Sequence, residues 1–270
     1  MERTSLPSES PPRPSLVVKI GGSILGNHDT TLRDLVALQQ RGNIPVVIHG
    51  GGQVITQWME KQGTLPRFVR GLRVTDAASM EIVAAVLCGL VNKSLVAEIQ
   101  SLGGKAMGVS GVDGEMLQAQ IMDPELGYVG RVTHVNPALI HHALAAGYIP
   151  VIAPVALQTG DSSSPGGVLL NINGDTAAGE IARALEAEAM VFLTDVEGVV
   201  DSNRRLISRL TASQGAALIR SGTIAGGMVP KVEACLRALE KVKVAHITSG
   251  SRERALLDFV EGRSRGTRIG

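Results

Sequence analysis

A lysine beside two glycines gives the first candidate for chemistry in this sequence. Lys19 lies in the apolar run Leu16–Ile20, and Gly21 and Gly22 follow that run directly. Glycines let backbone N–H groups approach an anion closely, and an ammonium group adds a positive charge. A plain strand-to-helix turn with an exposed lysine would give the same pattern, so this motif alone leaves both interpretations open.

A run of three glycines gives a second candidate anion site. Gly50, Gly51 and Gly52 follow an apolar segment that ends at His49, and a helical pattern begins at Gln53. A turn needs at most one or two glycines, whereas three at a helix start offer free amides aligned with the helix dipole. The run therefore favours anion binding. We assign His49 no chemical role, because a histidine among apolar neighbours is usually a core residue.

A lysine late in the chain stands at an unfavourable place for a cation. Lys231 follows Pro230, which suits the first position of a helix. A lysine in the first turn opposes the helix dipole at a cost of roughly 0.3–1 kcal/mol, which a bound phosphate would reverse. Lys231 is therefore a candidate functional residue.

Other polar side chains have both a functional and a structural explanation. Arg73 could pair with a carboxylate through two parallel hydrogen bonds, or lie on the surface. Asp175 precedes a helical pattern and is at least a plausible cap. Asn171 and Asn173 lie in the extended stretch before it, and we expect only one of them to face a site. The polar turn 195–200 could hold a nucleotide base or ribose.

Neither glycine motif matches the common nucleotide-binding signatures. The Walker loop needs Gly-x-x-x-x-Gly-Lys-Ser/Thr and the dinucleotide fingerprint needs Gly-x-Gly-x-x-Gly, and neither occurs here at a strand-helix junction. A P-loop NTPase and a Rossmann dehydrogenase are therefore disfavoured.

The elements that must position these residues alternate between strands and helices. Strands are predicted at 16–20, 45–49, 105–109, 149–153, 190–194 and 242–247, and helices at 31–41, 76–102, 137–146, 175–188, 211–221 and 230–240. This alternation is typical of a parallel sheet with helical crossovers. Segments 116–135 and 158–171 interrupt it. The first predicts hairpins over the sheet, and the second has a turn or flexible tip at its centre.

Composition excludes several classes of function. The 26 basic and 25 acidic residues nearly balance, so the chain has no overall basic footprint for nucleic acid and no polybasic membrane anchor. Cys88 and Cys235 suggest neither a disulfide framework nor a metal site. Residues 1–15, rich in Ser and Pro, predict a disordered tail without a signal sequence. No run approaches the roughly 18 apolar residues that span a bilayer, which indicates a cytoplasmic protein.

Together, the motifs resemble the amino-acid kinase family from about residue 16 to 269. The likeness is carried by Lys19-Ile20-Gly21-Gly22, His49-Gly50-Gly51-Gly52, Gly71-Leu72-Arg73-Val74-Thr75, Asn92-Lys93, Asn171-Ile172-Asn173-Gly174-Asp175, Gly226-Gly227-Met228 with Lys231, and Gly266-Thr267-Arg268-Ile269. Within the family, it is greatest to members that use ATP to phosphorylate the γ-carboxylate of N-acetyl-L-glutamate in arginine (ornithine) biosynthesis.

The resemblance implies a fold and a set of roles. It implies a three-layer αβα sandwich with a mostly parallel central sheet, an amino-acid-binding lobe at 16–180 and an ATP-binding lobe at 181–270. Lys19 and Lys231 would flank the transferring phosphoryl group, and Asp175 would hold both ammonium groups. The remaining implied roles are phosphate binding by Gly21 and Gly22, substrate binding by Gly51, Gly52, Arg73 and Asn171, and ATP binding by Asp195, Val196, Glu197, Gly198, Val199, Val200, Thr223, Ile224 and Ala225. The resemblance also implies Mg²⁺ carried on the ATP phosphates, with no protein metal site.

Two other activities and one departure from the family follow from the same resemblance. A related kinase acts on aminoadipate or glutamate attached to a carrier protein, and a sensor of this fold would be catalytically silent. The common Asn-Ala-Asp segment appears here as Asn173-Gly174-Asp175. Arginine-inhibited members carry an N-terminal helix that builds hexamers, whereas Pro11, Pro12 and Pro14 disfavour a helix here. We therefore predict a homodimer that is insensitive to arginine.

Overall fold

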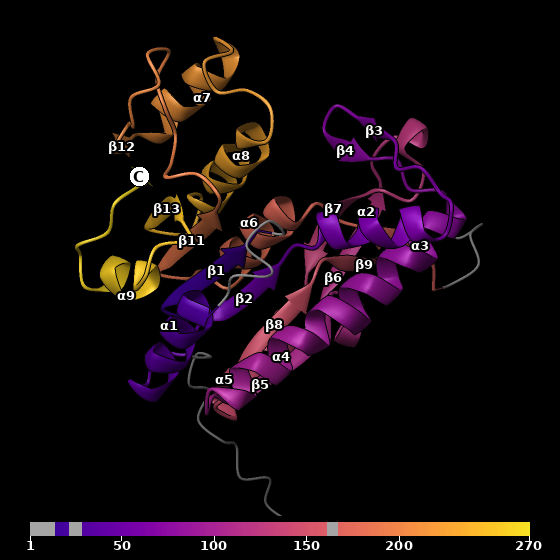
Figure 1. Cartoon of the computed structure of the whole chain (residues 1–270), viewed down its shortest axis with the longest axis horizontal. Helices are drawn as coiled ribbons and strands as arrows, with labels where there is room; N and C mark the ends of the chain where they lie inside the picture. Colours follow the sequence, from indigo (N-terminus) through magenta and orange to yellow (C-terminus); the bar gives the residue numbers. More distant parts are fainter. Residues whose placement is uncertain (1–13, 22–28, 161–166) are drawn as a thin grey trace, which may run out of the picture.

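The computed structural model describes residues 14–21, 29–160 and 167–270 (Figure 1). Most of the predicted tail and the predicted loop tip around residues 161–166 therefore lie outside the described residues. Gly22, predicted to bind phosphate, also lies outside them.

An eight-stranded sheet forms the centre of the molecule, in the order β12-β14-β13-β11-β1-β2-β8-β5. Its strands are β1 (Leu16–Ile20), β2 (Val46–His49), β5 (Ala106–Ser110), β8 (Ile149–Ala153), β11 (Ala189–Thr194), β12 (Arg209–Leu210), β13 (Val244–Ser249) and β14 (Thr267–Ile269). Every pairing in it is parallel except that of β13 with β14. The predicted mostly parallel sheet is confirmed.

Helices cover both faces of this sheet and complete the three layers (Figure 1). On one face lie α1 (Asp29–Gln40), α3 (Ala77–Ala84), α4 (Asn92–Ser101) and α9 (Ala255–Val260), with α2 (Gly52–Lys61) against α3. On the other lie α5 (Ala138–Ala145), α6 (Gly174–Ala184) and α8 (Met228–Ala238), with α7 (Ala212–Arg220) packed on α8. The α/β class predicted from the sequence is therefore correct.

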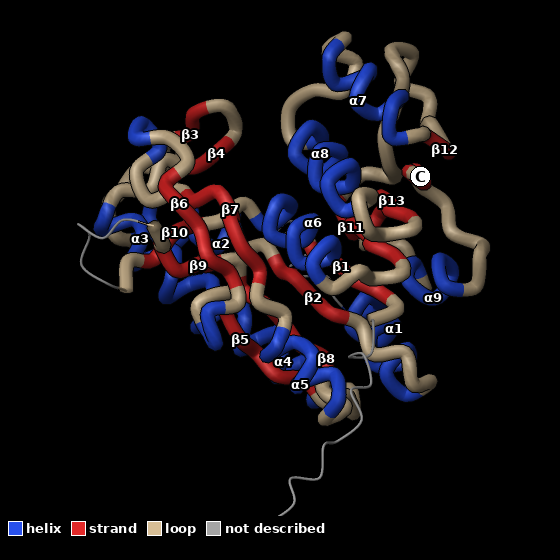
Figure 2. Tube along the Cα trace, turned by 180° about the vertical axis from the view of Figure 1, so that it is seen from behind, coloured by secondary structure: helices blue, strands red, loops and turns tan. Residues whose placement is uncertain are grey.

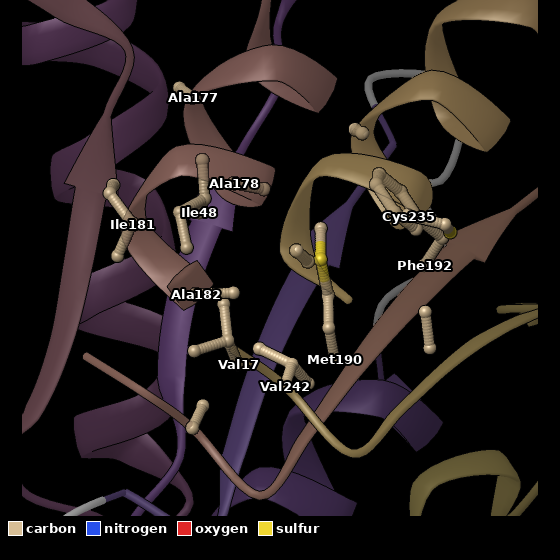
Figure 3. Packing of buried hydrophobic residues seen from close by; sticks show 14 of the residues in the cluster. Val17, Ile48, Ala177, Ala178, Ile181, Ala182, Met190, Phe192, Cys235 and Val242 are labelled. Atoms are coloured by element: carbon tan, nitrogen blue, oxygen red, sulfur yellow. The ribbon is translucent and has the colours of Figure 1, made fainter. Parts of the chain in front are cut away.

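The alternation of side chains along β1 decides which residues meet the helices of each face. Leu16, Val18 and Ile20 belong to the core beneath α1 and α9, whereas Val17 belongs to the core beneath α6 and α8. Figure 3 shows Val17 against Ala182 of α6. Because residues two apart on a strand share a face, Lys19 lies on the same side as Val17. Lys19 thus faces α6 and α8.

A long helical rod runs from α3 through the π-helical segment η1 (Ala85–Val91) into α4. Among the described residues, this rod, Ala77–Ser101, is the one helix long and apolar enough by length and composition to cross a membrane, with a mean hydropathy of 1.8. The sequence expectation concerned uninterrupted apolar runs. Glu81, Asn92 and Lys93 interrupt the rod, so it meets this test by its length and mean hydropathy and not by such a run. The rod packs on β5, β8, α1 and α2, as core helices of this composition do.

Two smaller sheets lie beside the central one (Figure 2). One joins β6 (Leu117–Ile121), β7 (Gly130–Val135), β9 (Val155–Gln158) and β10 (Leu169–Asn171), and the other is the hairpin of β3 (Phe68–Val69) and β4 (Leu72–Arg73). The antiparallel pairing of β6 with β7 confirms the predicted hairpin region. The β3-β4 hairpin was not predicted, because two-residue strands carry too little periodicity.

Two predicted helix starts differ from the structure. Helix α8 begins at Met228, so Pro230 is its third residue instead of its first. Proline is tolerated there, because the first-turn N–H groups of a helix have no intrahelical acceptor. Helix α6 begins at Gly174, and its cap is Asn173 instead of Asp175: the Asn173 side chain accepts hydrogen bonds from the backbone N–H groups of Asp175 and Thr176.

Candidate active site

A cavity of about 220 Å³ opens where β1 and β2 end and α6 begins. Parallel α/β sheets commonly bind ligands at this carboxyl edge. Its lining includes Lys19, Asp175, Arg73, Asn171 and the glycine run 50–52. The fold therefore brings together predicted site residues that are more than 150 positions apart in the chain.

Two lysines contact one carboxylate beside this cavity. Lys19 Nζ lies 2.6 Å from Asp175 Oδ1, and Lys231 Nζ lies 2.9 Å from Asp175 Oδ2. The side chains of Lys19 and Asp175 are only 8% and 6% exposed, and that of Lys231 is 18% exposed. Two ammonium groups against one carboxylate leave a formal charge of +1 in a poorly hydrated place. Such a site can stabilise the negative charge of a phosphoryl group.

Burial and charge pairing shift the pKa values of this cluster in opposite directions. Burial would raise the pKa of Asp175, but the ammonium groups of Lys19 and Lys231 outweigh it and hold that pKa below its ordinary value. Burial lowers the pKa of Lys19, with Asp175 opposing the shift and Lys231 adding to it. Asp175 therefore stays ionised and keeps Lys19 more easily protonated than burial alone would allow.

The contact between α6 and α8 sets how far Asp175 lies from Lys231. At Gly179 a Cβ atom would lie 2.8 Å from the carbonyl oxygen of Ala234, so only glycine permits this approach. Beside it, Glu180 accepts hydrogen bonds from Arg183 of its own helix and from Arg237 of α8. Small residues and a shared carboxylate thus hold the two helices together.

The glycine run forms the N-terminal side of α2, as predicted. Gly51 is the N-cap of α2 and Gly52 is its first residue, and both line the cavity. The first N–H groups of a helix have no intrahelical acceptor and are free for an anion. At Gly51 a Cβ would lie 2.5 Å from Leu87 Cδ2, whereas the side of Gly52 where a Cβ would point is open.

Gly21 is placed differently from the other glycines. Its backbone N–H donates to the carbonyl of Leu193 at 3.0 Å, which extends the ladder between β1 and β11 by one residue. This amide is therefore already engaged and is not free to donate to a phosphate.

Arg73 lines the cavity and is held in place on several sides. Its guanidinium donates to the carbonyl of Gly52 at 2.8 Å and to Thr56 Oγ1 at 2.7 Å, and it lies 4.7 Å from the ring centroid of Phe68. Arginine offers five N–H donors. Donors that remain after these contacts can receive a carboxylate in the cavity.

Asn171 is tied to the segment that follows Arg73. Its side-chain amide donates to Thr75 Oγ1 at 3.1 Å, and the Thr75 hydroxyl donates to the carbonyl of Arg73 at 3.0 Å. Thr75 is fully buried, so this chain of hydrogen bonds couples the two candidate substrate-binding residues.

Asn173 lines the same cavity, so the expectation that only one of Asn171 and Asn173 would face a site is wrong. Residues two apart on an extended segment point to the same side. The Asn173 side-chain oxygen caps α6, which gives this amide a structural task beside Asp175.

The predicted nucleotide-binding segments follow β11 and precede α8. The turn from Asp195 to Val200 begins beside the end of β1, because β11 and β1 are neighbours. Val199 and Ile224 are buried in the core and cannot offer their side chains to a ligand, whereas Asp195, Val196, Glu197 and Ala225 are exposed. Gly198 is buried, Val200 is exposed and Thr223 is partly exposed. Thr267 of β14 fixes the turn by accepting from the Val199 N–H at 2.8 Å.

An apolar wall of the cavity was missed in the sequence. It consists of Ile55, Phe68, Leu72, Leu87, Val129, Pro154 and Ile172. Phe68 remains 53% exposed although it lines the cavity. Phe68 and Leu72 are close to Arg73 in the sequence, which could have indicated that they share its site. The other residues of the wall are distant in the sequence, so their positions could not be predicted.

Comparison with known proteins gives two kinds of similarity. Residues 14–249 match the model of the amino acid kinase family. The acetylglutamate kinase of Dehalococcoides mccartyi strain BAV1 is 45% identical over 248 residues, covering 92% of this chain and 91% of the relative. The acetylglutamate kinase of Cereibacter sphaeroides strain ATCC 17029 is 44% identical over 246 residues, covering 90% and 82%.

A solved structure shows the same arrangement. N-acetylglutamate synthase from Neisseria gonorrhoeae, complexed with coenzyme A and N-acetyl-glutamate, superposes with a TM-score of 0.81 at 27% identity. The superposition covers 94% of this chain and 59% of that one, which is the longer protein.

Proposed function

Because the chain belongs to the amino acid kinase family, we propose that it transfers the γ-phosphoryl group of ATP to the γ-carboxylate of N-acetyl-L-glutamate. The product is N-acetyl-L-glutamyl 5-phosphate, an intermediate of arginine biosynthesis. The observation that carries this proposal is the cavity lined by Lys19, Asp175, Arg73 and Asn171, with Lys231 paired to Asp175 beside it. The relatives named above favour free acetylglutamate over a carrier-bound substrate, and favour an active kinase over a silent sensor.

The two lysines act on the phosphoryl group. Phosphoryl transfer depends mainly on positioning and on electrostatic stabilisation of the equatorial oxygens. Lys19 and Lys231 approach Asp175 from two sides, so an oxygen-rich group placed beside that carboxylate meets both ammonium groups. The acceptor carboxylate is already ionised at neutral pH and needs no general base. Asp175 thus positions the two lysines and abstracts no proton.

The opposite part of the cavity receives the amino acid. Arg73 would pair with a carboxylate of acetylglutamate, and Asn171 would donate to one of its polar oxygens. The Gly51 and Gly52 N–H groups would hold the reacting carboxylate, and the apolar wall with Phe68 and Leu72 would contact the acetyl group. Unmodified glutamate lacks this apolar group and carries an ammonium group, whereas the carboxylate in the described lining, Asp175, is already shared by two lysines.

The nucleotide would lie over the turn 195–200 and residues 223–225, with its phosphates directed at Lys19 and Lys231. Mg²⁺ would be held by phosphate oxygens and water, since Mg²⁺ keeps much of its hydration. Asp175 is occupied by both lysines and is not available as a ligand. When bound, the metal would neutralise charge on the β- and γ-phosphates.

We further propose that the protein is a cytoplasmic homodimer that does not respond to arginine. Of the prolines that support the last point, Pro11 and Pro12 lie outside the described residues. Gel filtration with and without arginine tests the dimeric state and the insensitivity to arginine. An arginine-dependent hexamer would contradict both.

The proposed reaction is tested by trapping the acyl phosphate with hydroxylamine. Purified protein with ATP and Mg²⁺ is offered N-acetyl-L-glutamate, glutamate, aspartate or aminoadipate in separate assays. Hydroxamate is expected with N-acetyl-L-glutamate alone. Hydroxamate from aminoadipate, or silence with every free amino acid, would overturn the assignment in favour of a carrier-bound substrate or a sensor.

A further inference from the structure

The proposed catalysis and substrate binding give no role to the Asn92-Lys93 motif. Asn92 is the first residue of α4 and is completely buried. Its amide nitrogen lies 2.9 Å from the carbonyl of Val151, 3.3 Å from that of Val109 and 3.2 Å from His49 Nε2. Its oxygen accepts from Lys93 Nζ. Asn92 thus joins the long helical rod to strands β2, β5 and β8.

These contacts define the protonation of His49. His49 Nδ1 lies 2.8 Å from the carbonyl oxygen of Gly50. A carbonyl oxygen can only accept, so Nδ1 must carry the proton, and Nε2 is then free to accept from Asn92. Burial, with smaller contributions from Lys19 and Lys93, lowers the pKa of His49 to about 4, although the hydrogen bond to Gly50 opposes the shift. His49 is therefore neutral near pH 7 and holds one tautomer.

The bond to Gly50 controls the next amide along the chain. In a planar trans peptide the C=O of one residue and the N–H of the following residue point in opposite directions. The Gly50 N–H is engaged with the carbonyl of Ile20 at 2.9 Å, and the Gly50 carbonyl is held by His49. The Gly51 N–H therefore points away from His49, and it has no acceptor among the described residues.

The π-helical segment packs against the peptide between Gly50 and Gly51. The Asn92 N–H donates to the carbonyl of Leu87, five residues earlier, which is the spacing of a π-helix. This spacing brings Leu87 and Asn92 to one side of the rod, where Leu87 packs on Gly51 and Asn92 bonds His49. The π-helical segment thus places Leu87 against Gly51 and Asn92 against His49.

We propose that His49 and Asn92 are positioning residues that fix the peptide between Gly50 and Gly51 so that the Gly51 N–H faces the cavity. This proposal rests on the proposed kinase activity. It assigns to the histidine no proton transfer: the ring acts as a donor to one carbonyl, and Asn92 maintains the tautomer that allows it to donate. The Gly51 N–H is then oriented before the substrate arrives, where it can stabilise charge in the transition state.

The first experiment compares two substitutions of the histidine. His49→Leu removes the donor, whereas His49→Asn keeps an N–H donor near the Nδ1 position. We expect kcat to fall about 10- to 100-fold in His49→Leu, with KM for N-acetyl-L-glutamate changed less than about threefold, and His49→Asn to recover most of the loss. Unchanged kcat in His49→Leu, or an equal loss in both variants, would overturn the proposal.

The second experiment separates positioning from loss of stability. Gln39 is a matched amide, because it bridges backbone groups of Lys105 and Gly147 away from the cavity. Asn92→Leu and Gln39→Leu should both lower the unfolding midpoint, but only Asn92→Leu should lower kcat. An equal effect on kcat would overturn the proposal. If the parent enzyme itself shows no kinase activity, the proposed function fails instead.

A third measurement does not depend on activity or on any variant folding. The ¹⁵N chemical shifts of the His49 ring in the parent protein distinguish a protonated Nδ1 from a protonated Nε2. We expect the Nδ1–H tautomer at neutral pH. The Nε2–H tautomer or an imidazolium would overturn the proposal.

Discussion

At the scale of single residues, the sharing of Asp175 between two lysines decides the electrostatics of the cavity. A carboxylate in the first turn of α6 is favoured by the helix dipole, whereas Lys231 in the first turn of α8 is disfavoured by it. The arrangement therefore leaves positive potential that only an anionic ligand relieves. An enzyme that transfers a phosphoryl group gains from this imbalance, because the charge of the reacting group completes the site.

Asp175→Asn should shift the alkaline limb of the pH–rate profile to lower pH. Burial lowers the pKa of Lys19 and Asp175 opposes that shift, so without the carboxylate Lys19 loses its proton at a lower pH. We also expect kcat to fall about 100- to 1000-fold. The measurement is kcat/KM from about pH 6 to 10.

Asp34→Asn is the matched control for this variant. Asp34 is also a buried carboxylate, but it accepts from the backbone N–H of Leu256 at the start of α9. Its substitution should change stability and leave the alkaline limb where it is. A limb that stays fixed in Asp175→Asn would refute the assigned role of Asp175.

Single residues could be predicted from the sequence where their type or local position was itself informative. Lys231 was found because a cation in a first helical turn is unfavourable, and Arg73 because its side chain suits carboxylates. Asn92 and His49 carry no such local signal, because Asn92 meets His49, Val109 and Val151 only in the folded sheet. The engaged amide of Gly21 was likewise invisible before the ladder between β1 and β11 was known.

At the scale of elements, helix α6 contains two glycines with opposite surroundings. At Gly174 a Cβ would meet nothing closer than 3.5 Å, the Cε of Lys19. Gly174→Ala should therefore be tolerated, should raise the free energy of unfolding by about 0.4–1 kcal/mol by restricting the unfolded chain, and should change kcat less than about twofold. Chemical denaturation and steady-state kinetics measure both. A large loss of activity would show that the Asn-Gly-Asp sequence is required here.

Gly179→Ala, five residues later, should have the opposite result. The added Cβ would lie 2.8 Å from a backbone oxygen of α8, which a rotamer change cannot relieve. We expect a loss of about 1–3 kcal/mol in stability. Because the helices must separate, Lys231 should also retreat from Asp175 and kcat should fall. A variant with lower stability but full kcat would mean that the helix contact does not position the lysine.

Elements with strong periodicity were predicted well. Strands β1 and β8 have the predicted bounds, since each is a short buried run rich in β-branched residues. Helix ends were less accurate: α6 stops at Ala184, near Glu186, which has a positive φ. The π-helical segment could not be predicted, because it depends on what the rod packs against and not on its own apolar pattern.

At the scale of the whole molecule, one sheet joins the two halves of the chain. β1 pairs with β2 on one side and with β11 on the other, so the strand that carries Lys19 belongs to both halves. We propose the lobe division near residue 180 as a functional one, with the amino acid held by the first half and the nucleotide by the second. Lys19 would then lie at their junction, beside both substrates.

The same sheet buries two histidines, which should make the molecule sensitive to mild acid. Burial lowers the pKa of both His49 and His246 from 6.5 to about 4. In the unfolded chain each would bind a proton near pH 6.5, so folding excludes these protons between that value and about pH 4. The stability they contribute is complete above pH 6.5 and is lost as the pH falls through this window, at about 1.4 kcal/mol per pH unit for each histidine. Asp175 does not account for such a loss, because its folded pKa lies below 3.8 and its contribution disappears only in stronger acid.

Urea unfolding at about pH 7.5, 6 and 5 measures this slope. The double variant His49→Asn and His246→Gln should lose most of this slope, although it starts from a lower stability. His141, whose pKa burial also lowers, keeps a smaller part of the slope. His134→Gln is the control, because His134 is exposed and should leave the slope of the parent unchanged. A double variant as steep as the parent would mean that the histidines are not the groups that titrate. A flattened dependence of stability on pH would show that the fold requires neutral rings of His49 on β2 and His246 on β13. The neutral ring of His49 is also the one that orients the Gly51 amide.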